Sequence, residues 1–192
     1  ALDTAIAAGV ERFGGLDIVV PAAGVFAESA PLSAVADEAW DRSIAVNATG
    51  VARLFARVHP YLALSPVGGR VVLVGTKNVA APGPGASAYS ASKTAASQLA
   101  RVAALEWAAD NIRVNTVNPD AVFDTGLWTP ELLAERAARY SMTVDEYKRR
   151  NLLGAEITSD DVARVVVELC AETFGRTTGA QVPVDGGNER VI

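Results

Sequence analysis

The chain has 192 residues, of which 50% are hydrophobic and 20% are charged, and its net charge is −5. That length allows one domain with a sizeable core, and the acidic balance lacks the basic surface of a nucleic-acid-binding protein. No apolar run reaches the ~20 residues of a membrane span, and no signal peptide opens the chain.

A single cysteine and a single histidine limit the chemistry further. Cys170 excludes an internal disulfide framework and suits the reducing cytoplasm. It falls in an apolar helical run, so we interpret it as part of the core rather than as a nucleophile. His59 alone cannot build a cluster of metal ligands, so no metal site is expected.

Helical periods and β-branched runs alternate along the chain. An opening helix over 1–13 ends at Gly14 and Gly15, and 16–20 is expected to be a buried strand. Further helices are predicted over 37–62, from 89 to about 109, and from a cap at Ser159 or Asp160 to about 171. Further strands are predicted over 70–74, 111–117 and 180–184.

Strands that alternate with helices predict an α/β fold with a doubly wound parallel sheet. Such sheets bind ligands at the carboxyl ends of their strands, and Gly24, Thr76 and Pro119 each follow one strand. Residues 127–153 interrupt the alternation with two charged helical pieces, at 131–140 and 144–150. Apolar side chains in this insertion predict a lid that excludes water from the site, and a surface used for oligomer contacts is the alternative.

A tyrosine and a lysine stand four residues apart at the start of the third predicted helix. Tyr89 and Lys93 therefore share one helix face. A phenol with a pKa of about 10 is a poor base at neutral pH, but a nearby cation favours the phenolate, so Tyr89 is a candidate general acid/base. Asn47 falls on the apolar stripe of the preceding helix, where it is either a satisfied structural amide or a site residue.

Residues 83–88 fit a G-x-G-x-x-A dinucleotide fingerprint between a strand and a helix. However, Pro84 restricts the turn that such a fingerprint needs. The acidic residue near the expected distance, Glu106, lies within a helix rather than at the end of a strand. We therefore discard this motif as a cofactor site.

Four polar residues stand in a distinctive order: Asn47, then Thr76 thirteen residues before Tyr89, then Lys93. With Ala23-Gly24 after the first strand and residues 185–187 after the last, this set resembles the short-chain dehydrogenase/reductase family from residue 1 to about Gly187. The resemblance implies a Rossmann-like dehydrogenase domain of which residues 1–192 are the C-terminal portion. The first strand–helix units and their Gly-rich turn are then expected to be absent, so the chain alone should bind NAD(H) very weakly.

The resemblance also implies roles for these residues. Tyr89 is the general acid/base, and Lys93 lowers its pKa and binds the nicotinamide ribose. Thr76 replaces the usual Ser, keeps the hydroxyl and orients the substrate oxygen, and Asn47 holds a water in the proton relay. Cofactor contacts are implied for Ala22, Ala23, Gly24, Asn47, Tyr89, Lys93, Pro119 and Val122. Two departures are Pro21-Ala22 in place of two asparagines and a threonine displaced to Thr125.

The implied function is that of a cytoplasmic NAD-dependent oxidoreductase, with NADP not excluded, acting on a secondary alcohol or small hydroxyaldehyde. A homodimer or homotetramer is implied through the helices that hold Asn47 and Tyr89. Residues 76–78, 118–123 and the insertion resemble, more narrowly, the dehydrogenase halves of bifunctional rhamnulose-phosphate aldolase/short-chain dehydrogenases, which implies lactaldehyde or a related substrate. The alternative is a catalytically silent scaffold, which the complete set of four residues disfavours.

Overall fold

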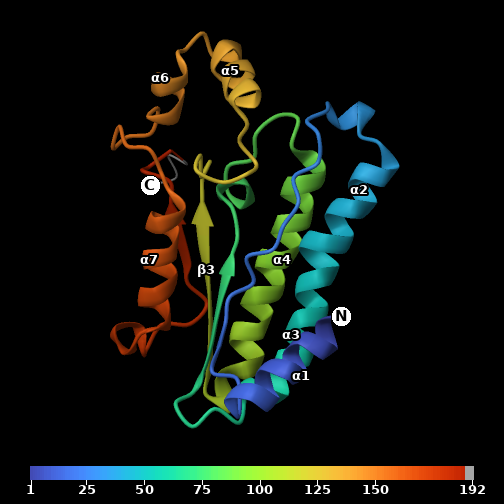
Figure 1. Ribbon diagram of the computed structural model, residues 1–192, viewed down its shortest axis with the longest axis vertical. Coiled ribbons are helices and arrows are strands. Elements are labelled where there is room, and N and C mark those ends of the chain that lie inside the picture. Colours follow the sequence, from blue (N-terminus) through green and yellow to red (C-terminus); the bar gives the residue numbers. More distant parts are fainter. Residues whose placement is uncertain (189–192) are drawn as a thin grey trace.

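The computed structural model describes residues 1–188, and its centre is a four-stranded parallel sheet (Figure 1). The strands lie side by side in chain order: β1 (Ile18–Val19), β2 (Gly69–Val74), β3 (Ile112–Pro119) and β4 (Gln181–Val184). Val71 of β2 is in register with Val19 on one side and Val114 on the other. All four carboxyl ends therefore meet at one edge of the sheet, as the predicted α/β fold requires.

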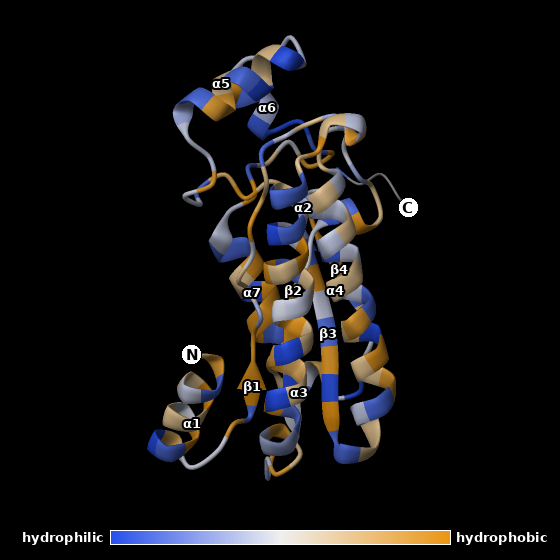
Figure 2. Ribbon diagram, turned by 90° about the vertical axis from the view of Figure 1, so that its right-hand side faces the viewer, coloured by the Kyte–Doolittle hydropathy of each residue, from blue (hydrophilic) through white to orange (hydrophobic). Residues whose placement is uncertain are grey.

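Helices cover both faces of this sheet, so it is doubly wound (Figure 1). One face carries α1 (Leu2–Phe13), α3 (Gly50–Leu62) and α4 (Ser87–Glu106), and the other carries α7 (Ser159–Cys170). Successive residues of β2 serve opposite faces, because Val71 and Leu73 pack with α3 and α4 whereas Val72 packs with α7. In Figure 2, β1 and β2 are mainly hydrophobic, and the helices around them alternate between hydrophobic and hydrophilic residues.

The predicted helix over 37–62 is three segments in the structure. They are α2 (Asp37–Ser43), a π-helical turn η2 (Ile44–Thr49) and α3. Such a turn adds one residue to the helical repeat and therefore changes which side chains face the core. Asn47 lies in this turn and is 1% exposed. The strands β2, β3 and β4 agree with prediction to within two residues. The prediction of a buried strand over 16–20 is wrong in part, because β1 is shorter and lies at the edge of the sheet, where Ile18 is 48% exposed and Val20 is 41% exposed.

The helix ends follow from local chemistry, with one correction. Gly14 ends α1 in the left-handed conformation (φ 81°), as predicted. Thr158, rather than Ser159 or Asp160, caps α7: its hydroxyl accepts from Asp161 N at 3.3 Å, and the Asp161 carboxylate accepts from Thr158 N at 2.9 Å. The Ser159 hydroxyl instead donates to Asp124 at 2.7 Å.

The predicted insertion folds as two short helices above the carboxyl edge of the sheet (Figure 1). They are α5 (Pro130–Arg139) and α6 (Val144–Lys148), and their side chains form a separate apolar cluster around Phe123, Leu133 and Tyr147. Cys170, at the end of α7, is half-buried against the core on that face, and burial raises the pKa of its thiol. Among residues 1–188, no helix combines the length and apolarity needed to cross a bilayer.

Gly75, directly after β2, leaves no room for a side chain. A Cβ there would overlap Asn118 Oδ1 and stand 2.9 Å from Thr116 Cγ2. We expect Gly75→Ala to destabilise the complete natural protein by about 1–3 kcal/mol, because overpacking forces neighbours to move. Thermal unfolding measures the effect. Gly83→Ala is the matched control, since nothing lies within 4 Å of the Cβ position there. Equal losses in the two variants would contradict the explanation.

Candidate active site

Helix α4 places Tyr89 and Lys93 one turn apart at its N-terminal end. Lys93 is 5% exposed, and its ammonium donates to the carbonyl oxygen of Val74, the last residue of β2, at 2.8 Å. Burial lowers the pKa of Lys93 to about 8, because a medium of low dielectric disfavours the charged form. The amine is therefore still mainly protonated at neutral pH.

The Tyr89 ring is half-buried and lies against Phe26, with 4.7 Å between the ring centroids. Burial raises the pKa of Tyr89, and the Thr76 hydroxyl lowers it by a smaller amount. The net direction is opposite to the one predicted from the Lys93 charge. The reason is that removing the phenolate from water is the larger effect here, while the Lys93 ammonium is bound to Val74 O.

Thr76 follows Gly75 at the carboxyl end of β2 and is 6% exposed. Its amide N donates to Asn118 Oδ1 at 3.1 Å, and its hydroxyl oxygen accepts from Asn78 N at 3.3 Å. The hydroxyl is therefore held in place while its own proton remains available for a second hydrogen bond. The structure brings Thr76 and Tyr89 together, as the predicted constellation requires.

Asn47 joins the loop after β1 to helix α4. Its Oδ1 accepts from Val25 N at 2.8 Å, and its Nδ2 donates to Val25 O at 2.9 Å and to Ser92 Oγ at 3.0 Å. Ser92 in turn donates to Tyr89 O at 2.9 Å. Asn47 is thus a satisfied amide that also belongs to the site, and both of its N–H donors are in use. Its role in holding a water stays a prediction.

Gly24, in the loop after β1, lies close to Asn47 and Lys93. A Cβ added to Gly24 would lie 3.4 Å from Asn47 Oδ1 and 3.5 Å from Lys93 Nζ. Gly24, Ala22 and Ala23 are exposed, so bare backbone lies beside the Lys93 ammonium. An ammonium has three donors, and Val74 O takes one of them. This arrangement fits a ribose that approaches the backbone closely and presents hydroxyl groups to Lys93.

The structure places the other two predicted cofactor residues at the end of β3. Pro119 is the last residue of that strand and is buried, and the Val122 side chain packs with the core beside α7. The displaced Thr125 donates to Val122 O at 2.9 Å. Contact of Pro119 and Val122 with a cofactor stays a prediction.

Sequence reasoning missed the polar groups that support Thr76. Asn118 is 7% exposed, and besides accepting from Thr76 N it donates at 3.2 Å to Oε1 of Gln181, the first residue of β4, so it links β3 to both neighbouring strands. Lys77 and Asp120 form an ion pair at 3.4 Å between the ends of β2 and β3. The available signal was that these polar residues stand at the carboxyl ends of buried strands. Among residues 1–188, no group of His, Cys, Asp and Glu could hold a metal ion.

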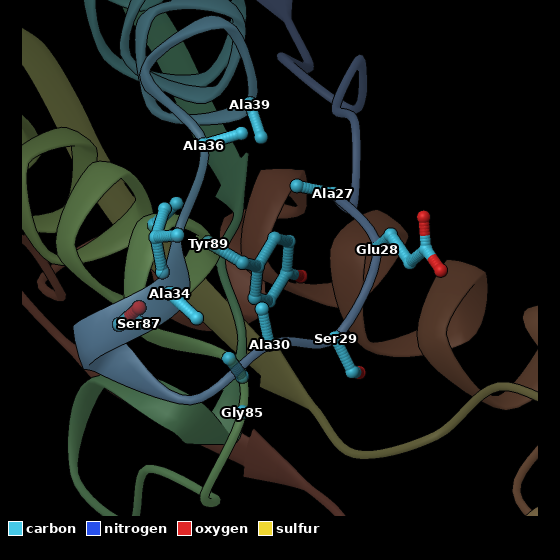
Figure 3. Close-up of a pocket in the computed structure, with 13 residues that line it drawn as sticks. Ala27, Glu28, Ser29, Ala30, Ala34, Ala36, Ala39, Gly85, Ser87 and Tyr89 are labelled. Atoms are coloured by element: carbon cyan, nitrogen blue, oxygen red, sulfur yellow. The ribbon is translucent and has the colours of Figure 1, made fainter.

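Beside Tyr89 lies a cavity of about 220 Å³ (Figure 3). Seven of its thirteen lining residues are alanines, and we call it the alanine-lined chamber: Ala27, Ala30, Ala34, Ala36, Ala39, Ala86 and Ala88, with Glu28, Ser29, Val35, Gly85, Ser87 and Tyr89. Ala30 N donates to Gly85 O at 3.2 Å, and this hydrogen bond joins the wall formed by 27–30 to the wall formed by 85–88. Gly85 has φ +79°, which favours glycine. The discarded fingerprint at 83–88 therefore forms part of this wall.

Comparisons with known proteins identify the family of the chain. A family model described as enoyl-(acyl carrier protein) reductase matches residues 1–189. The uncharacterized oxidoreductase YuxG of Bacillus subtilis (strain 168) is 35% identical over 180 residues, which cover 91% of this chain and 26% of YuxG. Dehydrogenase/reductase SDR family member 4 of Homo sapiens is 33% identical over 185 residues, which cover 95% of this chain and 63% of that protein.

The chain thus spans about a quarter of YuxG and less than two thirds of the human relative. Among solved structures, carveol dehydrogenase from Mycobacterium avium in complex with NAD is 27% identical, with a TM-score of 0.87. That similarity covers 97% of this chain and 69% of the carveol dehydrogenase chain. From the family model, the relatives and the shared fold, the chain belongs to the short-chain dehydrogenase/reductase family.

Proposed function

We propose that these residues form the nicotinamide side of the active site of an NAD-dependent oxidoreductase that interconverts a secondary alcohol and its carbonyl product. NADP is not excluded. The observation that carries the proposal is the meeting of Thr76, Tyr89 and Lys93 beside the bare backbone at Gly24. The NAD complex of carveol dehydrogenase supports the choice of cofactor. A silent scaffold is disfavoured, since it has no need of a buried ammonium.

The proposed chemistry moves one proton at the Tyr89 oxygen. In carbonyl reduction, Tyr89 donates its proton to the substrate oxygen while the Thr76 hydroxyl donates a hydrogen bond to the same atom. In alcohol oxidation, the Tyr89 oxygen accepts the hydroxyl proton. The nicotinamide, when bound, supplies or accepts the hydride, and its oxidised form carries a positive charge. Because burial raises the pKa of Tyr89, the base role depends on added positive charge nearby, which the oxidised nicotinamide would supply when bound.

A small hydroxyaldehyde such as lactaldehyde is the second candidate substrate. The observation in its favour is the similarity to YuxG, a protein of which this chain spans only 26%. YuxG therefore has a long segment outside the part that matches this chain. The narrower resemblance to aldolase/dehydrogenase proteins implies relatives of this kind. The same catalytic residues serve either substrate, since lactaldehyde also carries a secondary hydroxyl group.

We further propose a homo-oligomer in the cytoplasm, joined through α3 and α4. An apolar groove of about 320 Å³ runs between these helices and is lined by Phe55, Leu99, Val102 and Trp107 among others. On α4, Leu105 is 82% exposed and Val102 is 39% exposed. An apolar helix face of this kind is typical of a surface that a partner covers.

Tyr89→Phe in the complete natural protein should reduce turnover by about 10²–10⁴-fold, because the ring still packs against Phe26 but has no proton to move. Steady-state rates with NAD(H) and thermal unfolding test this together. Tyr61→Phe is the matched control, since it makes the same chemical change on α3. If Tyr89→Phe kept more than about a tenth of the wild-type rate, the assignment of Tyr89 as the general acid/base would be wrong.

The Lys93 pKa predicts a specific dependence of stability on pH. Lys93 loses its proton near pH 8 when folded and near its ordinary value of 10.5 when unfolded. Between these values the unfolded state binds more protons, so rising pH stabilises the protein; below pH 8 the cost of burying the charge is fully present. From pH 7 to pH 10, wild type should gain about 2–3 kcal/mol relative to Lys93→Met.

Denaturant unfolding at the two pH values measures this difference. Arg12→Met, which removes an exposed cation from α1, is the control and should follow wild type, since arginine stays charged between pH 7 and pH 10. A pH profile that is the same for wild type and Lys93→Met would show that Lys93 is not buried as an ammonium. Loss of activity in Lys93→Met, but not in Arg12→Met, is expected in parallel.

The lid role of the insertion is also a proposal. Arg136 of α5 donates to Ser29 Oγ at 2.5 Å, so the insertion already touches a residue that lines the alanine-lined chamber. Hydrogen exchange of 127–153 should slow when NADH and an unreactive substrate analogue bind, because a closing lid orders its backbone and excludes water. Helix α1 serves as the internal reference. If hydrogen exchange in 127–153 does not slow at saturating ligand concentrations, the insertion is not a lid.

A further inference from the structure

The walls of the alanine-lined chamber are mostly methyl groups. Figure 3 shows the Tyr89 ring among Ala27, Ala30 and Ala34. Ala88 is buried, Ala27 and Ala30 are half-buried, and Ala34 is exposed at the mouth. Methyl walls attract apolar surface and offer no hydrogen bonds. The part of a ligand that enters the chamber is therefore expected to be apolar.

No cationic side chain is among the lining residues, and the Arg136 guanidinium that reaches the lining residue Ser29 is hydrogen-bonded to its hydroxyl. Glu28, the charged member of the thirteen lining residues, is exposed and directs its carboxylate away from Tyr89 (Figure 3). The Ser87 hydroxyl is buried, and within residues 1–188 it has no hydrogen-bond partner. A neutral ligand is favoured, because an unpaired charge among methyl groups loses its hydration without compensation.

The volume of the chamber indicates the size of that ligand. An apolar cavity of roughly 150 Å³ binds benzene. The alanine-lined chamber is larger, at about 220 Å³, and is open to solvent beside Glu28, Ala34 and Ala36, so it has room for a six-membered ring with a small substituent whose far end reaches the opening. A three-carbon hydroxyaldehyde would leave most of this space to water and would place its second oxygen beside methyl groups.

We propose that the alanine-lined chamber binds the apolar ring of the substrate, and that the substrate is a neutral cyclic secondary alcohol or its ketone. The reacting carbon then lies beside the Tyr89 hydroxyl, with the rest of the ring between Ala27 and Ala30. This inference rests on the proposed function and chooses between its two candidate substrates. It assigns Ala30, whose methyl group lies next to the Tyr89 ring in Figure 3, as a specificity-determining residue.

The first experiment compares alcohols as substrates for NAD-dependent oxidation by the complete natural protein. The probes are 2-propanol, lactaldehyde, cyclohexanol, 4-methylcyclohexanol and the anionic 4-hydroxycyclohexanecarboxylate. Each buried CH₂ group contributes roughly fourfold, so kcat/KM for cyclohexanol should exceed that for 2-propanol or lactaldehyde by at least about tenfold. The carboxylate should be the poorest ring substrate. Preference for lactaldehyde or for the anion would overturn the proposal.

The second experiment fills the chamber with Ala30→Leu. We expect kcat/KM for cyclohexanol to fall at least about tenfold while that for 2-propanol changes less than about twofold, since the extra atoms occupy the space of the ring. Ala8→Leu, an exposed site on α1, is the matched control. If Ala30→Leu does not fold, Ala27→Leu tests the same wall. Equal loss for both alcohols, in a folded variant, would show that the chamber does not hold the substituent.

A binding measurement separates this inference from the proposed function. Saturation-transfer NMR should show cyclohexanol bound to wild type and to Ala8→Leu but not to Ala30→Leu, whether or not turnover occurs. Equal signals from wild type and Ala30→Leu would overturn the inference. Failure of every alcohol to be oxidised would instead refute the proposed function alone, and binding would still decide what the chamber holds.

Discussion

A buried ammonium fixes the N-terminal part of helix α4 to the carboxyl end of β2. Lys93 donates to Val74 O, and the close approach of Gly24 and the hydrogen bonds of Asn47 assemble around it. Desolvating an ammonium is unfavourable, and one carbonyl offsets only part of that cost. The chain therefore keeps a destabilising group at the point where three segments meet, which is typical of a site maintained for chemistry rather than for stability.

The same burial acts in opposite directions on the two neighbouring groups. It lowers the pKa of Lys93 to about 8 and raises that of Tyr89, because each neutral form is favoured in a dry environment. Tyr89 therefore keeps its proton at neutral pH, and in the proposed reaction its use as a proton acceptor depends on added positive charge. Spacing along a helix indicated that the two side chains are neighbours, but it could not indicate which of the two electrostatic effects is larger.

Much of the fold followed from the sequence because the two central strands, β2 and β3, are buried almost throughout. The run over 71–74 is continuously apolar and carries three valines, which is typical of a strand buried in a parallel sheet. The π-helical turn at Asn47 was not predictable, since it depends on hydrogen bonds to Val25 and Ser92, which are 22 and 45 residues away. The alanine-lined chamber was missed for a similar reason: methyl groups from 27–30, 34–39 and 85–88 make it, and alanine carries no chemical signal.

The loop over 20–31 serves both sides of the site, and its position therefore couples them. Gly24 lies against Lys93 and Asn47, where the ribose is proposed to bind, while Phe26 packs on Tyr89 and Ala30 lines the chamber. Two hydrogen bonds from Asn47 to the backbone of Val25 hold the loop between these sides. A shift of the loop at Val25 would move two parts of the site together: the backbone at Gly24, beside the proposed ribose site, and Ala27 and Ala30 in the wall of the chamber. The side chain of Asn47 thus fixes the one segment that reaches both the proposed ribose site and the chamber.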